Sequence, residues 1–243
     1  MTRWIFRCAW AGIVLSILVA MNHAKAGNKI ALVYKGPGSC DEDCSVASAH
    51  VAELAGFEVR YVGPDETNPN IFQDAAVYFQ PGGYSKTVGD TMIEPMKEAL
   101  KNFIANGGGY VGFCAGGFYA SKPRTVYKYL GIAAVQSDLA NLPTSIIPVS
   151  WKDGTNRSVY FEGGPFFVVP KRSKFEVISR YADGRAAGVQ GPFGKGRVAV
   201  VGYHPEAPEW WRNYYKMVDP DGITADEQMA VDMIRWVTRT EKF

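Results

Sequence analysis

Short apolar runs alternate with helix-spaced apolar positions along the first half of the chain. The runs predict four strands, at Lys29–Tyr34, Phe57–Val62, Ala75–Gln80 and Gly109–Cys114. Apolar residues at helical spacing predict helices at Cys44–Ala55 and Met92–Ala105, and a third helical stretch follows Cys114. This order of elements is typical of a parallel sheet with helices on its faces.

The pattern becomes β-rich after about residue 140. Short apolar segments separated by turn residues occupy 145–151, 158–161, 165–170 and 175–181, and a hairpin is predicted around Gly191–Gly196. Thr224–Arg239 closes the chain as a helix, with Thr224 as the expected N-cap. We therefore expect one α/β domain over residues 27–243. It should be a flavodoxin-like three-layer sandwich with a mostly parallel central sheet and extra β-hairpins in its C-terminal half.

Residues 1–26 have the composition of a secretory signal peptide. Arg3 and Arg7 precede the uncharged run Ala9–Met21, and the sequence AKA ends at Ala26. The alternative is an uncleaved membrane anchor, but the apolar run is short for a span of about 20 residues. We expect cleavage near Ala26 and a periplasmic or secreted protein that meets the membrane only during export.

Removal of this segment changes the net charge. The whole chain has 26 Lys+Arg against 24 Asp+Glu, a formal charge of +2, and loss of Arg3, Arg7 and Lys25 leaves 23 against 24, or −1. The mature chain has no basic block, so we expect no nucleic-acid partner. We expect a small-molecule or peptide-like ligand instead, and the sequence gives no indication of the oligomeric state.

The mature chain has three cysteines, Cys40, Cys44 and Cys114. An odd number in an exported protein leaves at least one thiol unpaired within the chain. Cys40 and Cys44 are four residues apart in an acidic loop, and we expect them to form a disulfide in an oxidising compartment. A metal site is the competing interpretation, but no histidine stands near them, so we predict no metal and no cofactor.

The remaining thiol lies in the sequence GFCAG, which fits the thiol form of the nucleophile elbow, G-x-C-x-G. In this motif a strand turns sharply into a helix and presents the nucleophile at the turn, where glycines avoid crowding. A helix N-terminus next to the cysteine also favours the thiolate, which is the reactive form. The competing interpretation of Cys114 is a buried cysteine in a glycine-rich turn.

A thiol nucleophile needs a base, and the base needs a partner that fixes its tautomer. His204 and Glu206 follow the apolar strand VAVV directly and are two residues apart. Residues at that spacing face the same side of a strand end. We therefore predict Cys114, His204 and Glu206 as a catalytic triad.

Three further positions are candidates for oxyanion binding. Gly82 and Gly83 follow the strand expected to lie beside the elbow strand, and with the Ala115 N–H group they would form an oxyanion hole. Glu162, in YFEGGPFF, is a candidate substrate contact or an ordinary turn carboxylate. The aromatic sequence EWWRNYY, at 209–215, is either a wall of the cleft or core packing.

The order strand-PGG, then G-x-C-x-G, then H-P-E resembles the class I glutamine amidotransferase-like superfamily. Within it, LVYKGPGS, FEGGPFF and the solitary domain look most like the biotin-protein-ligase N-terminal-domain-like proteins. The resemblance implies a flavodoxin-like fold and the triad above. Glutamine amidotransferases usually carry Gln four residues after the nucleophile, and this chain has Phe118 there. The resemblance therefore does not predict glutamine as the substrate.

We expect an exported thiol hydrolase or amidase-like protein that acts on an amide, such as a γ-glutamyl or peptide-like compound. One alternative is a non-catalytic protein that binds a small molecule or peptide in the same pocket. A further alternative is a redox sensor that combines Cys114 with Cys40 and Cys44. Membership of a fold class does not choose among these functions.

Overall fold

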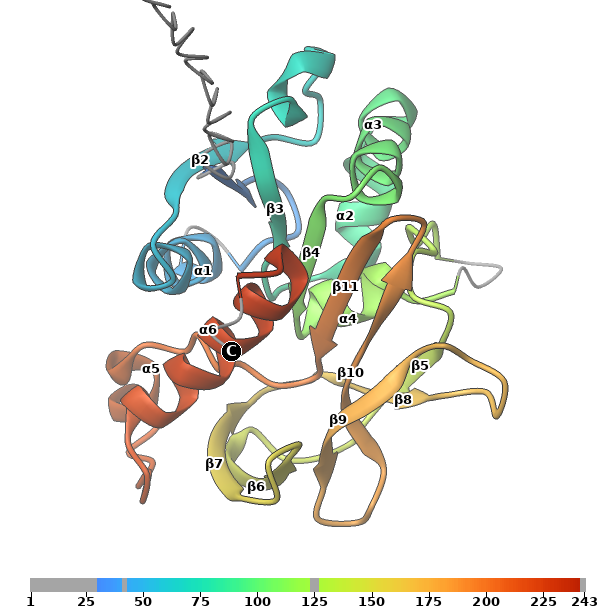
Figure 1. Ribbon diagram of the computed structural model, residues 1–243. Helices are drawn as coiled ribbons and strands as arrows, with labels where there is room; N and C mark the ends of the chain where they lie inside the picture. The colour runs from blue at the N-terminus through green and yellow to red at the C-terminus, as the bar shows by residue number, and fades with distance from the viewer. Residues whose placement is uncertain (1–29, 41–42, 123–126, 241–243) are drawn as a thin grey trace, which may run out of the picture.

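The computed structural model describes residues 30–40, 43–122 and 127–240, and the predicted signal peptide lies outside these ranges. One sheet crosses the domain, with strand order β2-β1-β3-β4-β11-β10-β9-β6-β7 (Figure 1). Its first five strands are mutually parallel: β2 (Glu58–Val62), β1 (Ile30–Tyr34), β3 (Ala75–Gln80), β4 (Gly109–Phe113) and β11 (Gly196–Val201). This part matches the predicted sheet.

The remaining strands are antiparallel, so the sheet is mixed rather than mostly parallel as predicted. They are β10 (Ala186–Phe193), β9 (Glu176–Tyr181), β6 (Ser145–Trp151) and β7 (Asn156–Phe161), with β5 (Gln136–Leu139) and β8 (Pro165–Val168) pairing beside β10. The predicted β-hairpins are present, and they extend the central sheet. Short turns leave no room for the helical crossover that parallel pairing needs.

Helices cover both faces of the parallel half, which confirms the three-layer sandwich (Figure 1). Helices α2 (Ser85–Thr91), α3 (Glu94–Ala105) and α4 (Ala115–Ala120) pack on one face. Helices α1 (Asp43–Leu54) and α6 (Ile223–Thr238) pack on the other. The short elements α5 (Glu209–Tyr214) and η1 (Pro69–Phe72) complete the described fold.

Two helix starts differ from the sequence-based expectation. The helix predicted from Met92 begins at Glu94, because Met92 ends the separate helix α2 and Pro95 favours a start at the first helical turn. The last helix begins at Ile223 with Gly222 as its N-cap, so the prediction of Thr224 as the cap is wrong. Asp219 Oδ1 accepts the Gly222 N–H group instead, at 3.3 Å.

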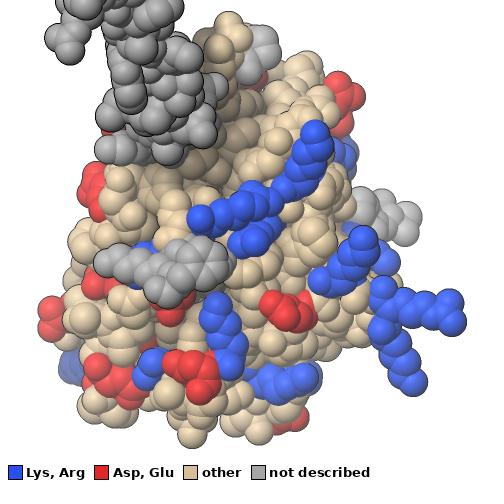
Figure 2. Space-filling view, in the orientation of Figure 1, with Lys and Arg blue, Asp and Glu red and all other residues tan. Residues whose placement is uncertain are grey.

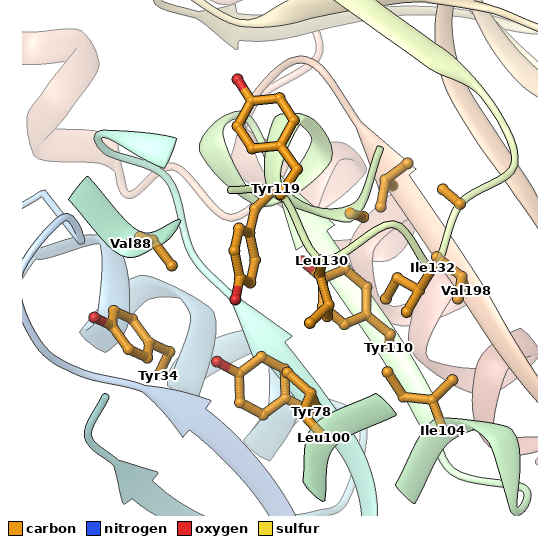
Figure 3. Close-up of a cluster of buried hydrophobic side chains, with 14 of the residues drawn as sticks. Tyr34, Tyr78, Val88, Leu100, Ile104, Tyr110, Tyr119, Leu130, Ile132 and Val198 are labelled. Carbon is orange, nitrogen blue, oxygen red and sulfur yellow. The ribbon is translucent and has the colours of Figure 1, made fainter. Parts of the chain in front are cut away.

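A cluster of buried tyrosines lies under the turn after β4. Figure 3 shows Tyr78, Tyr110 and Tyr119 packed with Leu100 and Ile104 from α3. The Tyr110 hydroxyl donates to the Gly116 carbonyl at 2.9 Å, which ties the first turn of α4 to the sheet. Burial raises the pKa of Tyr110 well above its ordinary value, so the hydroxyl remains a donor over the whole physiological range.

Within the described ranges, none of the helices combines the length and the apolar character that crossing a bilayer requires.

The first turn of α4 fits against β3 only because position 116 has no side chain. A Cβ atom at Gly116 would lie 2.1 Å from the backbone oxygen of Gln80, whereas one at Gly63 would meet only the flexible carboxylate of Asp65, at 3.1 Å. We predict that Gly116→Ala lowers the free energy of unfolding by about 1–3 kcal/mol, the usual cost of overpacking. Urea denaturation measures this loss, and Gly63→Ala serves as the control with little change. Equal effects of the two substitutions would show that the contact is not limiting.

Candidate active site

Three loops meet at the carboxyl edge of the parallel strands. Gly82 and Gly83 follow β3, Cys114 follows β4, and His204 follows β11 after two residues. Strand β4 pairs with β3 on one side and with β11 on the other, both in parallel. Parallel neighbours end at the same edge of a sheet, so the pairing places these loops side by side.

Cys114 occupies a strained turn between β4 and α4. Its backbone has φ 47° and ψ −104°, a region that residues with a Cβ atom seldom adopt. The flanking glycines are required, because a Cβ atom at Gly112 would lie 2.7 Å from the backbone of Gly116. This is the geometry that the G-x-C-x-G motif predicts. Backbone strain at a single functional residue is typical of sites whose geometry is imposed by the surrounding fold.

Cys114 is 5% exposed, and its side chain has two polar neighbours. Its thiol donates a hydrogen bond to the Glu162 backbone oxygen, with Sγ and O 3.4 Å apart. The Cys114 side chain also interacts with the His204 imidazole closely enough to help raise its pKa. The thiol therefore stands between a main-chain oxygen and the imidazole.

His204 is held by Glu206 through a hydrogen bond of 2.9 Å between Nδ1 and Oε1. Both side chains are buried, at 4% and 2% exposure for the residues. A carboxylate at Nδ1 fixes the proton there and leaves Nε2 for a partner on the other side of the ring. The structure thus brings together the three residues that the sequence predicts as a triad.

The pKa of His204 lies well above its ordinary value. Burial alone lowers the pKa, because it penalises the imidazolium, but the Glu206 carboxylate and the Cys114 side chain outweigh that effect. His204 is therefore protonated over a wider pH range than a free histidine. A protonated imidazole beside a cysteine is the arrangement that favours a thiolate.

Two aromatic rings bracket the imidazole edge to face. The ring centroid of His204 lies 5.8 Å from that of Tyr160 and 5.4 Å from that of Trp211. The backbone N–H of His204 also donates to the Tyr160 oxygen at 2.9 Å. On its remaining side the ring faces Gly82, where an added Cβ atom would lie 2.5 Å from Cε1. The imidazole is thus confined on several sides.

A cavity of about 730 Å³ opens above the thiol. Its lining includes four of the predicted site residues: Gly83, Cys114, Glu162 and His204. Gly82 packs behind His204, Glu206 is buried beneath it, and Ala115 begins α4 directly after the nucleophile. The first N–H groups of a helix have no partner within the helix, so the Ala115 N–H remains a candidate oxyanion donor together with Gly83.

The wall of the cavity also contains the Cys40–Cys44 pair. The two cysteines lie at disulfide distance, with Cα atoms 5.3 Å apart, as the sequence predicts. They stand in the same cavity as Cys114 because the loop after β1 reaches the same sheet edge. A Cβ atom at Gly82 would lie 3.1 Å from Cys44 Sγ, which places this sulfur beside the imidazole as well.

The aromatic segment at 209–215 is a cavity wall. Trp210, Trp211, Tyr214 and Tyr215 line the cavity. The segment is anchored from behind by Arg212, which is 3% exposed and donates from Nε to Asp219 at 2.7 Å and from a second nitrogen to Asp226. Arg212 also donates to the Ala207 oxygen at 2.5 Å. The anchor joins α5 to α6.

Four residues of the described cavity lining were not predicted: Asp43, Tyr84, Tyr160 and Gly163. Asp43, Tyr84 and Gly163 stand next to predicted site residues in the chain, and this adjacency is the only sequence signal for them. Tyr160 carries no such signal, because its place depends on the bridge between its strand and His204.

Phe118 does not line the cavity. It is half-buried and packs against the core cluster that contains Tyr119 and Leu130. The ring therefore contributes to the core under α4 rather than to a site for an amide side chain. Among the described residues, no group of three or more His, Cys, Asp or Glu side chains has the arrangement of a metal site.

Comparison with known proteins supports the resemblance inferred from the motifs. Residues 29–130 match the family model described as biotin-protein ligase, N terminal, a segment that contains Cys114 but not His204. Over 160 residues the chain is 25% identical to the biotin–protein ligase of Schizosaccharomyces pombe. That alignment covers 54% of this chain and 25% of the ligase, so this chain spans only about a quarter of its relative. The predicted resemblance is confirmed.

Solved structures extend the likeness beyond residue 130. PurLQS from Thermotoga maritima matches with a TM-score of 0.57 at 18% identity, over 85% of this chain and 97% of that one. A glutamine amidotransferase from the same organism matches with a TM-score of 0.54 at 12% identity, over 88% and 97%. The chain has the class I glutamine amidotransferase-like fold. At these sequence identities the shared fold does not indicate which substrate the protein uses.

The His204–Glu206 pair predicts a dependence of stability on pH. The pKa of His204 is raised in the folded state, so its pairing stabilises the amidotransferase-like domain fully below the unfolded value of about 6.5. That stabilisation is lost as pH rises through the folded pKa. Glu206→Gln should lower the pKa of His204, as measured by NMR titration with the His50 signal as an internal reference. The stability gap between wild type and variant should narrow with rising pH; a widening gap would contradict the pairing.

The cysteine pair predicts a defined mass. Unreduced protein from an oxidising compartment should carry Cys40 and Cys44 in one peptide that lacks two hydrogen atoms relative to the reduced peptide, while Cys114 remains a thiol. Peptide mass spectrometry after alkylation without reductant measures both. Alkylation of Cys40 and Cys44 under these conditions would show that the disulfide is not formed, and Cys114→Ser provides the control for assigning the single label.

Proposed function

We propose that this protein is an exported cysteine-dependent amidohydrolase. The observation that carries the proposal is the arrangement of His204 between the Glu206 carboxylate and the thiol of Cys114, at the floor of a cavity. A nucleophile, a base within reach of it and a group that orients the base are the parts that covalent acyl transfer requires. Export rests on the composition of residues 1–26.

In the proposed reaction the Cys114 S–H bond breaks and His204 holds the proton, while Sγ attacks the carbonyl carbon of an amide and a C–S bond forms. The negative charge that develops on the carbonyl oxygen is stabilised by the N–H groups of Gly83 and Ala115. Collapse of this intermediate breaks the C–N bond, and His204 donates its proton to the leaving amine. Water then attacks the thioester with His204 as base, which releases the acid and restores the thiol.

The role of Glu206 in this scheme is to position and charge the imidazole. It touches neither the cavity above the thiol nor the reacting atoms, and its hydrogen bond holds one tautomer of His204. The amide is proposed to be γ-glutamyl or peptide-like. Free glutamine is not favoured, because Phe118 packs into the core where amidotransferases usually carry a glutamine.

One alternative function is supported by the position of the disulfide. Cys40, Cys44 and Cys114 line one cavity, so Cys114 could exchange with the disulfide as part of a redox sensor. A second alternative is a binding protein without turnover, favoured by the departure at Phe118 from the amidotransferase pattern. The experiment below separates these alternatives from catalysis.

Alkylation by iodoacetamide tests whether Cys114 is an activated nucleophile. At neutral pH we expect Cys114 to react about tenfold or more faster than N-acetylcysteine, and His204→Ala to remove this excess, since proton transfer to a positioned base contributes at least that much. Intact-mass spectrometry follows the labelling. His50→Ala is the matched control, because His50 lies half-exposed on α1 and bonds to Glu227, away from the thiol.

Turnover is tested with a panel of γ-glutamyl and peptidyl amides. A covalent acyl adduct should form on Cys114 and be absent in Cys114→Ala. Fast, His204-dependent alkylation without any adduct or product supports the binding protein. Slow labelling that does not depend on His204 would contradict the proposed enzyme. A disulfide from Cys114 to Cys44 or Cys40 after mild oxidation would support the redox sensor.

A further inference from the structure

The charged groups in the active-site cavity have one sign, apart from the histidine of the triad. Asp43 and Glu162 line it, and neither Lys nor Arg is present among the described lining residues. The Glu162 side chain is exposed, and its Oε2 accepts a hydrogen bond from the Tyr160 hydroxyl at 2.9 Å. This bond holds one carboxylate oxygen against the wall and leaves the other available to a ligand.

Aromatic rings form a large part of the cavity wall, and several of them are unusually exposed. The exposed fractions are 73% for Tyr84, 52% for Trp210, 75% for Tyr214 and 47% for Tyr215. Exposed rings that share a cavity with carboxylates form a site for organic cations, because the ring faces and the carboxylates both attract positive charge. An anionic ligand would face repulsion from the same groups.

The single cation of the aromatic segment is turned away from the cavity. Arg212 lies in the middle of that segment, yet it is buried behind it and paired with Asp219 and Asp226. Burial raises the pKa of Asp226 to about 8, so Asp219 carries most of the compensating charge near neutral pH. The guanidinium therefore does not compete for the cavity. The segment presents its rings to one side and its guanidinium to the other.

A second cavity of about 310 Å³ adjoins the first and shares Asp43 and Trp210 with it. Its described lining adds the carboxylates of Glu206, Glu209 and Glu227, with His50 as the basic group, bonded to Glu227 at 3.1 Å. Glu206 Oε2 has no hydrogen-bond partner among the described residues. Figure 2 shows acidic side chains gathered on the side of α1 and α5, whereas Lys and Arg gather on the opposite side.

We propose that the ligand of this site is an organic cation, an amide that carries an ammonium or guanidinium group on the side chain next to the reacting carbonyl. The cation lies against the exposed rings of Trp210 and Tyr214 and pairs with Glu162, while the carbonyl faces Cys114. The amide part rests on the proposed function. The preference for positive charge rests on the cavity lining alone, so the two are tested separately.

Charged thiol reagents measure this preference at the position of the reacting atom. Methanethiosulfonates that carry a trimethylammonium, a primary ammonium, a sulfonate or a methyl group each transfer their thiol half to Cys114 and release methanesulfinate. Intact-mass spectrometry gives the rate of Cys114 modification by each reagent. Dividing it by the rate of the same reagent with N-acetylcysteine leaves the effect of the site on the rate. We expect the cationic reagents to react about tenfold or more faster than the sulfonate, the range of electrostatic enhancement in a cleft of one sign.

Variants locate the source of that ratio. Glu162→Gln and Trp210→Ala should each reduce the cation-to-anion ratio severalfold, with circular dichroism confirming that the variants are folded. Glu98→Gln is the matched control: Glu98 is exposed on α3 and lines neither cavity, so its substitution should leave the ratio unchanged. Equal normalised rates for cation and sulfonate in the wild type, or an equal loss in Glu98→Gln and Glu162→Gln, would overturn the proposal.

Protection experiments identify the kind of cation. N-acetyl-lysine amide and N-acetyl-arginine amide should slow the reaction of Cys114 with neutral iodoacetamide, whereas the uncharged linear N-acetyl-norleucine amide should not. Stronger protection by one of the two cationic amides assigns the ammonium or the guanidinium, and equal protection by norleucine amide counts against a cation site. A charge preference with no hydrolysis of any amide contradicts the proposed function and leaves the cation site standing.

Discussion

The parallel pairing of β4 with β3 and β11 is the constraint on which the rest of the site depends. It sets three loops at one edge of the sheet, and each loop brings a different part of the chemistry: glycine backbone, thiol and imidazole. The approach is close enough that only glycine fits at position 116 against Gln80 and at position 82 against His204. The close packing of the elbow against β3 is therefore also needed for the chemistry. A larger residue that moved the elbow away from β3 would also move the thiol away from His204.

The residues of the triad could be predicted from the sequence, whereas the residues that wall the cavity and anchor its wall could not. G-x-C-x-G and H-P-E are local patterns whose geometry follows from a strand end and a tight turn, so Cys114, His204 and Glu206 could be named in advance. The antiparallel half of the sheet was underestimated, because short β-rich segments do not reveal whether they join the central sheet or stack on it. Tyr160 and the Arg212 anchor depend on contacts between residues far apart in the chain, and no periodicity encodes such contacts.

Buried charge is treated in two different ways within a few residues. Arg212 pairs with Asp219 and Asp226 and fixes the aromatic segment, whereas Glu206 gives one oxygen to His204 and leaves the other without a partner among the described residues. The first arrangement stabilises a wall, since breaking a buried ion pair is costly. The second raises the pKa of His204, so the imidazole beside the thiol stays protonated to a higher pH.

The position of β11 also limits how the chain can be divided. The segment that matches the ligase family model ends at residue 130, before the strand that covers β4 on its second side. A fragment cut there would expose the N–H and C=O groups of β4 along an apolar strand, and such unpaired edges recruit other chains into sheets. The nucleophile would then lie on an edge prone to aggregation. Strand β11 thus has two roles. It positions His204, and it pairs with β4 so that the edge of β4 is not exposed to other chains.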